Sequence, residues 1–184
     1  MKDKLIVLDR DGVINFDSDD YIKSVDEWIP IPGSIEAIVR LKQAGYTVVV
    51  LTNQSGIARG YYSVETLNQM HEKLNALLAE SNVEIDGIYY CPHGPDDDCD
   101  CRKPRAGLFY QALKALGLSE AGFKNIPSIG DSWRDLEAAL KVGAKPILVL
   151  TGKGARTFEA KGDQIREQNI PVFNDLASVV DNLI

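Results

Sequence analysis

The residues of this chain that could do chemistry follow short apolar segments. Asp9 and Asp11 come directly after one such segment, Thr52 follows a second, Asp131 follows another, and Lys103 lies in a long loop. A carboxylate can attack phosphorus and form an aspartyl-phosphate, which divides one difficult displacement into two easier steps. We therefore expect Asp9 to be the nucleophile of a phosphoryl-transfer reaction.

The other polar residues of this set suit the remaining needs of that reaction. Mg²⁺ prefers carboxylate oxygens, and Asp9 and Asp131 could hold it from neighbouring strands. Asp11 could protonate the leaving oxygen and later activate water. The Thr52 hydroxyl and nearby backbone N–H groups could bind phosphate oxygens, and Lys103 could stabilise the transferred group. An Asp-x-Asp-Gly sequence alone is more often a turn, so only the number of these clusters favours a site.

A second group of residues with chemical potential is the cysteine loop. All three cysteines and one of the two histidines lie between residues 91 and 104. A disulfide framework would leave one of three cysteines unpaired. The spacing C-x-H-x5-C-x-C differs from that of the usual zinc fingers, but unrelated thiols gathered in one acidic loop are the less favoured interpretation. The pattern therefore indicates a metal site close to Lys103.

Strands alternate with helices along the chain, and together they must position these residues. The apolar runs that we expect to be strands cover residues 5–8, 46–51, 85–90, 126–129 and 146–150. Helices are expected from Ser34 to Gly45, from Ser63 onward, over residues 107–116 and over residues 135–142, with both serines as N-terminal caps. Near-continuous apolar strands suit a parallel sheet covered on both faces. The predicted fold is therefore α/β, with a doubly wound parallel sheet.

The chain is expected to form one domain, residues 1–184, because it shows no repeat, low-complexity stretch or linker. Ligands bind outside the carboxyl ends of the strands in such a sheet, so the polar clusters should meet at one edge. The stretches from Asp11 to Thr52 and from Thr52 to Lys103 each hold one helix and one strand beside loops, which leaves no room for a cap domain. Loops, including residues 12–32, should close a shallow site that suits a small phosphorylated sugar.

Composition excludes several classes of partner. The formal net charge of −7 argues against a nucleic-acid partner, because such a protein needs a basic face. No apolar run is long enough to span a bilayer, and the N-terminal sequence lacks the long apolar stretch of a signal peptide. We expect a cytoplasmic protein without membrane partners, acting as a monomer.

The motifs together resemble a known superfamily. Asp9-Arg10-Asp11-Gly12-Val13, Thr52, Lys103 and Gly130-Asp131 resemble, in order, the four motifs of the haloacid dehalogenase phosphatase superfamily. The segments TNQSGIARG (52–60), IYYCPH (88–93) and CDCRKP (99–104) are similar to those of the D-glycero-D-manno-heptose 1,7-bisphosphate phosphatases. The histidinol-phosphate phosphatases are relatives with a similar zinc loop. The resemblance covers nearly the whole chain and implies a Rossmann-like haloacid dehalogenase fold.

The resemblance also implies roles for individual residues. Asp9 would be the nucleophile and Asp11 the acid/base. Mg²⁺ would be held by Asp9, the backbone carbonyl of Asp11 and Asp131, and Zn²⁺ by Cys91, His93, Cys99 and Cys101. Substrate or phosphate contacts are implied for Thr52, Asn53, Gln54, Ser55, Arg102 and Lys103. Arg59 follows a glycine-containing turn, and we expect it to contact substrate rather than to remain a solvated surface residue.

The activity implied is Mg²⁺-dependent hydrolysis of the C7 phosphate of D-glycero-D-manno-heptose 1,7-bisphosphate, leaving heptose 1-phosphate for the synthesis of ADP-heptose and lipopolysaccharide core. Histidinol phosphate or another small phosphosugar is the alternative substrate. Two other classes are a zinc interaction module without catalysis, and a phosphotransferase or mutase. The strand-end aspartates argue against the first, and the lack of a water-excluding cap argues against the second.

The roles of a few further residues are less clearly indicated by the sequence. Asp135 could support the magnesium site or be an acidic residue favoured by the helix dipole. Ser132 stands where some members of the superfamily have lysine. His71 is expected at the edge of the core rather than as a ligand or base. Trp28 either lines the mouth of the site or packs against loops.

Overall fold

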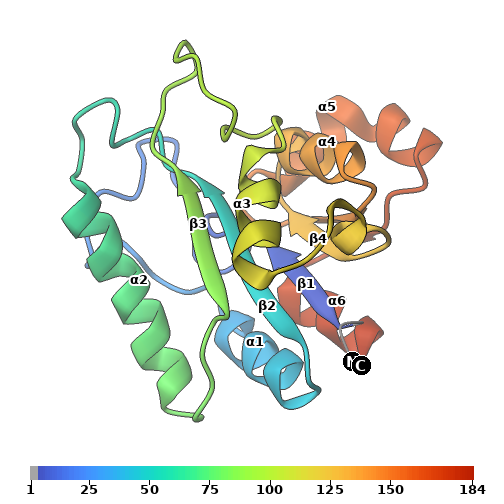
Figure 1. The fold of residues 1–184 in the computed structure, drawn as a ribbon, viewed down its shortest axis with the longest axis horizontal. Helices are drawn as coiled ribbons and strands as arrows, with labels where there is room; N and C mark the ends of the chain where they lie inside the picture. Colours follow the sequence, from blue (N-terminus) through green and yellow to red (C-terminus); the bar gives the residue numbers. More distant parts are fainter. Residues whose placement is uncertain (1–3) are drawn as a thin grey trace.

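Six parallel strands form one sheet in the computed structural model, which describes residues 4–184 (Figure 1). The strands are β1 (Leu5–Leu8), β2 (Thr47–Asn53), β3 (Gly87–Cys91), β4 (Pro127–Gly130), β5 (Lys145–Val149) and β6 (Val172–Phe173). Their order across the sheet is β3-β2-β1-β4-β5-β6. The chain winds outward from β1 in one direction and from β4 in the other, so the predicted doubly wound α/β fold is confirmed.

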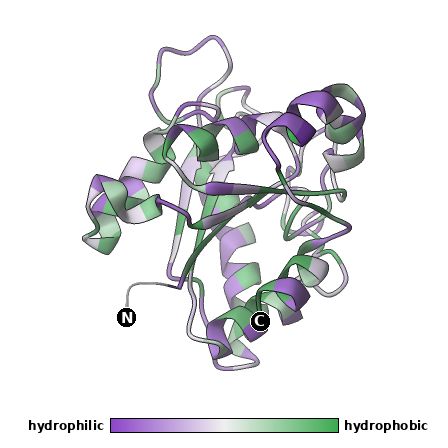
Figure 2. Cartoon of the chain, turned by 90° about the vertical axis from the view of Figure 1, so that its right-hand side faces the viewer, coloured by the Kyte–Doolittle hydropathy of each residue, from purple (hydrophilic) through white to green (hydrophobic). Residues whose placement is uncertain are grey.

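Helices cover both faces of this sheet. They are α1 (Ser34–Gln43), α2 (Val64–Ala79), α3 (Gly107–Leu116), α4 (Trp133–Lys141), α5 (Gly154–Glu167) and α6 (Leu176–Leu183), with one 3-10 turn at Glu120–Phe123. Each helix carries both hydrophobic and hydrophilic residues, whereas the central strands are mostly hydrophobic (Figure 2). None of the described helices is long and apolar enough to cross a membrane.

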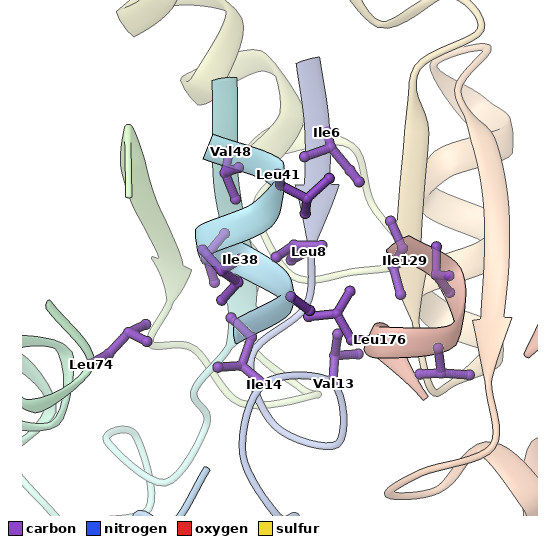
Figure 3. Packing of buried hydrophobic residues seen from close by; sticks show 14 of the residues in the cluster. Ile6, Leu8, Val13, Ile14, Ile38, Leu41, Val48, Leu74, Ile129 and Leu176 are labelled. Atoms are coloured by element: carbon purple, nitrogen blue, oxygen red, sulfur yellow. The ribbon is translucent and has the colours of Figure 1, made fainter. Parts of the chain in front are cut away.

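The alternation of side chains along β1 shows how one strand serves two cores. Ile6 and Leu8 point to the face covered by α1, α2 and α6, where they pack near Ile38 and Leu41 of α1 (Figure 3). Leu5 and the other odd-numbered residue of β1 point to the opposite face, covered by α3 and α4. Successive side chains of a strand point to opposite faces, so a continuous apolar run is what a sheet covered on both sides requires.

The helix ends follow the sequence signals with one exception. Ser63 caps α2 as predicted, since its side chain accepts a hydrogen bond from the backbone N–H of Thr66. The prediction that Ser34 caps α1 is wrong, because the cap position is Gly33. The Ser34 hydroxyl instead donates to the carbonyl oxygen of Ile14 at 2.6 Å. This carbonyl also accepts from the backbone N–H of Ile31 at 2.9 Å, so Ser34 is a second donor to an oxygen that has two lone pairs.

The last third of the chain adds elements that the sequence patterns did not predict. The short strand β6 extends the sheet beyond β5, α5 packs against β5, and α6 packs against α1 and β6. β6 has only two residues, and α5 has few apolar positions, so neither produces a clear periodic signal. The predicted strands are confirmed with ends that differ by one or two residues; in particular, Thr52 and Asn53 belong to β2 itself.

The sheet reverses its winding between β1 and β4, and no separate domain is inserted anywhere in the described part of the chain. Crevices in open α/β sheets form outside the carboxyl ends of the strands at such a switch point. Loops gather above this edge, and the long loop after β3 rises furthest (Figure 1). The fold therefore directs the candidate residues to one place.

Candidate active site and metal-binding loop

A cavity of about 310 Å³ opens at the switch point, and the candidate residues line it. All the residues predicted to act in catalysis, magnesium binding or phosphate binding are part of this lining: Asp9, Asp11, Thr52, Asn53, Gln54, Ser55, Arg59, Arg102, Lys103 and Asp131. These residues come from segments that are up to 122 positions apart (131 − 9) in the sequence. The tertiary structure therefore brings the four motifs into one cavity.

Asp9 lies just beyond the end of β1, where its own backbone N–H donates to the carbonyl of Ile129 at 2.9 Å. Its Oδ1 accepts from the backbone N–H of Arg10 at 2.8 Å and from Lys103 Nζ at 3.1 Å. Burial and the nearby charge of Asp135 raise the pKa of Asp9 to about 7, although Lys103 acts in the opposite direction. A nucleophile in this position needs cations around it to remain a carboxylate.

Lys103 is the central cation of the site. Its ammonium lies 3.1 Å from Asp9 Oδ1, 2.6 Å from Asp135 Oδ1 and 2.6 Å from the carbonyl oxygen of Leu51. Burial alone would lower the pKa of Lys103, but the charges of Asp135 and Asp9 raise it above its ordinary value. The backbone of Lys103 is held by Asn53, whose side chain accepts from its N–H and donates to its carbonyl, both at 3.0 Å. Asn53 therefore holds the backbone of Lys103 in place in addition to lining the cavity.

Asp135 has the helix-start position that was one of its two sequence interpretations, and its support of the magnesium site stays a prediction. It lies in the first turn of α4, and its Oδ2 accepts from the backbone N–H of Ser132 at 3.0 Å and from the Ser132 hydroxyl at 2.7 Å. Its Oδ1 binds Lys103 at 2.6 Å. Burial would raise the pKa of Asp135, but Lys103 and these hydrogen bonds lower it below its usual value. Asp135 therefore takes part in the capping box at the start of α4 and is also the main partner of Lys103.

Carboxylate oxygens of Asp9, Asp131 and Asp135 lie within 4.8 Å of one another, which fits a hard divalent cation. Burial raises the pKa of Asp131 well above its ordinary value, and the charges of Asp135 and Asp9 add to this effect. Asp131 Oδ2 also fills space that a side chain at Gly12 would occupy, since a Cβ there would lie 2.0 Å from it. When all three carboxylates are ionised, their negative charge exceeds what Lys103 can balance, and a divalent cation would stabilise that form, so the site fits Mg²⁺.

The carboxylate of Asp11 lies outside that metal-binding group and has different partners. Its Oδ1 accepts from Arg10 Nε and Asn15 Nδ2, both at 2.8 Å, and its Oδ2 accepts from Gln54 Nε2 at 3.0 Å. Burial would raise the pKa of Asp11, but the Arg10 charge and these hydrogen bonds hold it below its usual value. These contacts favour the charged carboxylate of Asp11, and the negative charge of a bound phosphate would move it toward the protonated form. The contribution of its backbone carbonyl to magnesium binding stays a prediction.

Thr52 and Gln54 form a polar wall at the end of β2. The Thr52 hydroxyl accepts from Gln54 Nε2 at 2.9 Å, and the Gln54 carbonyl oxygen accepts from the Tyr62 hydroxyl at 2.6 Å. The hydroxyl hydrogen of Thr52 therefore stays available to a phosphate oxygen. Tyr62 was not found by sequence reasoning, because nothing in its local pattern marks it as part of the cavity.

The rim of the cavity carries more positive charge than the net charge of the whole chain suggests. Arg59, Arg102 and Arg134 line it, and none of them pairs with a carboxylate among the residues that the structure describes. Lys153 also lines the cavity, but it is paired with Asp17 of the long loop before α1. Sequence reasoning missed both Arg134 and Lys153. The position of Arg134 in the first turn after the fourth motif is the only signal that could have indicated it.

The cysteine loop brings its four candidate ligands into one cluster. Cys91 Sγ lies 3.5 Å from His93 Nδ1, 3.9 Å from Cys99 Sγ and 3.0 Å from Cys101 Sγ, and His93 Nδ1 lies 3.3 Å from Cys101 Sγ. Ligands at about 2.3 Å from a tetrahedral zinc ion would be separated by about 3.8 Å. The donor set and these separations fit Zn²⁺ with every position filled, so zinc here would be structural. The neighbouring Asp96, Asp97 and Asp98 are exposed.

Removal of one zinc ligand should lower activity while the fold persists. Cys99→Ser should lose most bound zinc, and kcat/KM should fall roughly ten- to a hundredfold because Arg102 and Lys103 follow the last ligand directly. Far-UV circular dichroism should change little, since Cys91 and Cys101 pack against the core formed by α3 and α4. Metal analysis should find about one zinc ion per chain in the wild type. Asp98→Ser, in the same loop, is the matched control, and full activity in a zinc-free Cys99→Ser protein would contradict a role for the metal.

Comparison with known proteins gives consistent matches. A family model described as HAD-hydrolase-like matches residues 100–179, and one described as polynucleotide kinase 3 phosphatase matches residues 3–133. Proteins named D-glycero-beta-D-manno-heptose-1,7-bisphosphate 7-phosphatase are 56% identical in Pseudomonas putida, over 98% of this chain and 99% of the relative, and 55% identical in Pseudomonas aeruginosa, over 100% and 99%. The crystal structure of the D,D-heptose 1,7-bisphosphate phosphatase of B. bronchiseptica, complexed with magnesium and phosphate, is similar with a TM-score of 0.91 and 48% identity, covering 98% of this chain and 97% of that one.

Proposed function

This chain belongs to the D-glycero-beta-D-manno-heptose-1,7-bisphosphate 7-phosphatase family of HAD-like phosphatases, and we propose that it removes the C7 phosphate of the β-anomer of this sugar bisphosphate. Identity of 48–56% extends over nearly the full length of the chain. The single structural observation that carries the proposal is the convergence of Asp9, Asp11, Lys103 and Asp131 in one cavity.

The reaction that these residues support has two steps. In the first, an Asp9 oxygen forms a bond to phosphorus while the bond from phosphorus to the sugar oxygen breaks, and Asp11 gives its proton to that oxygen. In the second, Asp11 takes a proton from water as the water oxygen attacks the aspartyl-phosphate, which releases phosphate and restores Asp9. Lys103, beside Asp9, stabilises the charge on the transferred group. Mg²⁺ held by Asp9 and Asp131 would offset repulsion between the phosphate and the carboxylates.

The arginines at the rim support a substrate with a second phosphate. Arg59, Arg102 and Arg134 lack carboxylate partners among the described residues. The two lysines that line the same cavity, Lys103 and Lys153, are paired with carboxylates. Guanidinium groups without a carboxylate partner around a polar cavity suit a dianionic ligand, because a planar guanidinium can bind two phosphate oxygens at once. The phosphate at the far end of the sugar would meet this rim while the C7 phosphate meets Asp9.

The position of cleavage is tested by the product. Phosphorus NMR after exhaustive turnover of heptose 1,7-bisphosphate should show free phosphate and a sugar that keeps only its anomeric phosphate. We expect turnover of the β-anomer to exceed that of the α-anomer, because the names of the relatives specify the β-anomer as their substrate. A product that keeps only the C7 phosphate would contradict the proposal. Histidinol phosphate and fructose 1,6-bisphosphate serve as comparison substrates, and faster turnover of histidinol phosphate would favour the alternative.

We further propose that the whole chain works as one phosphatase domain, as a monomer in the cytoplasm. One sheet carries every residue of the site, and no residue of the described cavity needs a second copy to complete it. The three cysteines are free thiols, which suits a reducing compartment. A product that keeps an activated anomeric phosphate suits a later nucleotidyl transfer, such as the formation of an ADP-heptose for lipopolysaccharide core.

A further inference from the structure

Arg10 lies between the two aspartates of the first motif and is completely buried. A buried guanidinium is costly unless its charge is paired and its N–H groups find acceptors. Arg10 meets this requirement on one side through Asp11, because its Nε donates to Asp11 Oδ1 and its NH2 forms an ion pair with the same oxygen, both at 2.8 Å. The guanidinium therefore helps to fix the orientation of the Asp11 carboxylate, together with Asn15 and Gln54.

The other end of the Arg10 guanidinium meets helix α2. Its NH1 lies 3.3 Å from His71 Nε2 and 3.7 Å from the sulfur of Met70. Arginine has no acceptor atoms, so the contact with His71 is a hydrogen bond when Nε2 is unprotonated and accepts. Burial and the charge of Arg10 lower the pKa of His71 to about 4, which keeps the ring neutral at physiological pH. Sulfur is a weak acceptor, so His71 is the main partner of NH1.

We propose that His71 is a positioning residue for catalysis, holding Arg10 in the orientation in which Arg10 fixes the acid/base Asp11. The proposal rests on the role proposed above for Asp11. His71 lies 60 positions from Asp11 in the sequence (71 − 11) and does not line the cavity. The contact that connects it to the reacting groups is its hydrogen bond with Arg10.

The hydrogen bonds of Asp11 show why this orientation matters. Its Oδ1 is occupied by Arg10 and by Asn15 Nδ2. Its Oδ2 accepts only from Gln54 among the described residues, which leaves a lone pair for proton exchange with the substrate oxygen or with water. If Arg10 rotates, Oδ1 keeps Asn15 as its only donor residue among those described, so the carboxylate can turn and Oδ2 moves relative to the reacting phosphate. A displacement of about 1 Å in such a group can cost about a hundredfold in rate.

Three substitutions of His71 separate the hydrogen bond from packing. His71→Gln keeps an acceptor at nearly the reach of Nε2, His71→Asn keeps polarity but is too short to reach Arg10, and His71→Leu removes the acceptor while filling the space. We expect kcat of the Leu and Asn variants to fall roughly ten- to a hundredfold with KM changed less than about twofold. His71→Gln should keep most of the wild-type kcat. Leu74→Met, one turn further along the buried face of α2, is the control for altered packing and should keep wild-type kcat.

Each variant should be assayed with p-nitrophenyl phosphate and with heptose 1,7-bisphosphate, after circular dichroism has shown that it is folded. The proposal is overturned if folded His71→Leu or His71→Asn keeps wild-type kcat, if Gln and Asn lose activity equally, or if KM rises while kcat stays unchanged. Where the Leu variant does not fold, the Gln and Asn pair gives the same decision. If the wild type hydrolyses p-nitrophenyl phosphate but not heptose 1,7-bisphosphate, the substrate assignment is wrong. The His71 variants can then still be compared with p-nitrophenyl phosphate.

Discussion

Asp9→Asn is expected to abolish phosphate release, with kcat lowered by roughly 10⁴- to 10⁶-fold, as when the nucleophile of a covalent mechanism is removed. Asparagine has almost the size of aspartate and can still accept from Lys103 and from the backbone of Arg10, but its amide cannot attack phosphorus. Uncatalysed hydrolysis of phosphate monoesters is among the slowest known reactions, so phosphate release without the nucleophile should not be detectable. Single-turnover experiments should also find no acid-stable phosphoryl label on the variant.

The stability of the same variant distinguishes lost chemistry from lost structure. The pKa of Asp9 is raised to about 7, so the folded protein without metal disfavours its charge, and neutralising it should remove a cost. The melting temperature of Asp9→Asn in metal-free buffer at pH 8 should therefore equal or exceed that of the wild type. Asp181→Asn, an exposed residue on α6 that pairs with Arg40, is the control and should keep full activity. Near-normal turnover in a folded Asp9→Asn protein would exclude the aspartyl-phosphate mechanism.

Lys103→Met should damage both activity and stability. The ammonium of Lys103 lies between Asp9 and Asp135 and is 5% exposed, so its loss leaves two buried carboxylates without their cation. Breaking a buried ion pair from one side costs about 3–5 kcal/mol of unfolding free energy, and removing one preorganised donor to the transferred group lowers kcat by about 10²- to 10³-fold. Urea unfolding and steady-state kinetics measure the two effects. Lys114→Met, on the exposed side of α3, should change stability by less than about 0.5 kcal/mol.

The stability difference between wild type and Lys103→Met should depend on pH. Lys103 lowers the pKa of Asp135 below the ordinary value of 3.8, so the stability from this pair is present above that value and is lost as pH falls through the lower folded pKa. The same pair raises the pKa of Lys103 above 10.5, so its contribution persists to at least that pH. The difference in unfolding free energy should therefore be largest between about pH 5 and 10 and shrink below about pH 4. A difference that does not shrink below about pH 4 would show that Lys103 contributes through packing alone.

The sequence alone was sufficient to predict most of the sheet and the composition of the cavity. Continuous apolar runs such as Leu5–Leu8 bury both faces of a strand, and the polar residues after them must then emerge at the carboxyl edge of a parallel sheet. Because these are local patterns combined with one general rule of α/β folds, Asp9, Asp11, Thr52 and Asp131 could be placed together without coordinates. The ligand cluster from Cys91 to Cys101 was equally accessible, since its members are close in the sequence.

Contacts between distant segments were decided only by the tertiary structure. The partner of Asp135 is Lys103 from the loop after β3, the partner of Arg10 is His71 from α2, and Arg134 reaches the rim from α4. None of these has a periodic signature, because each depends on which two elements the fold places side by side. Ser34 illustrates the same limit: its sequence context predicted a helix cap, but a nearby buried carbonyl took its hydroxyl. Local pattern determines which face of an element is buried, whereas only packing determines which polar groups must satisfy one another across the interior.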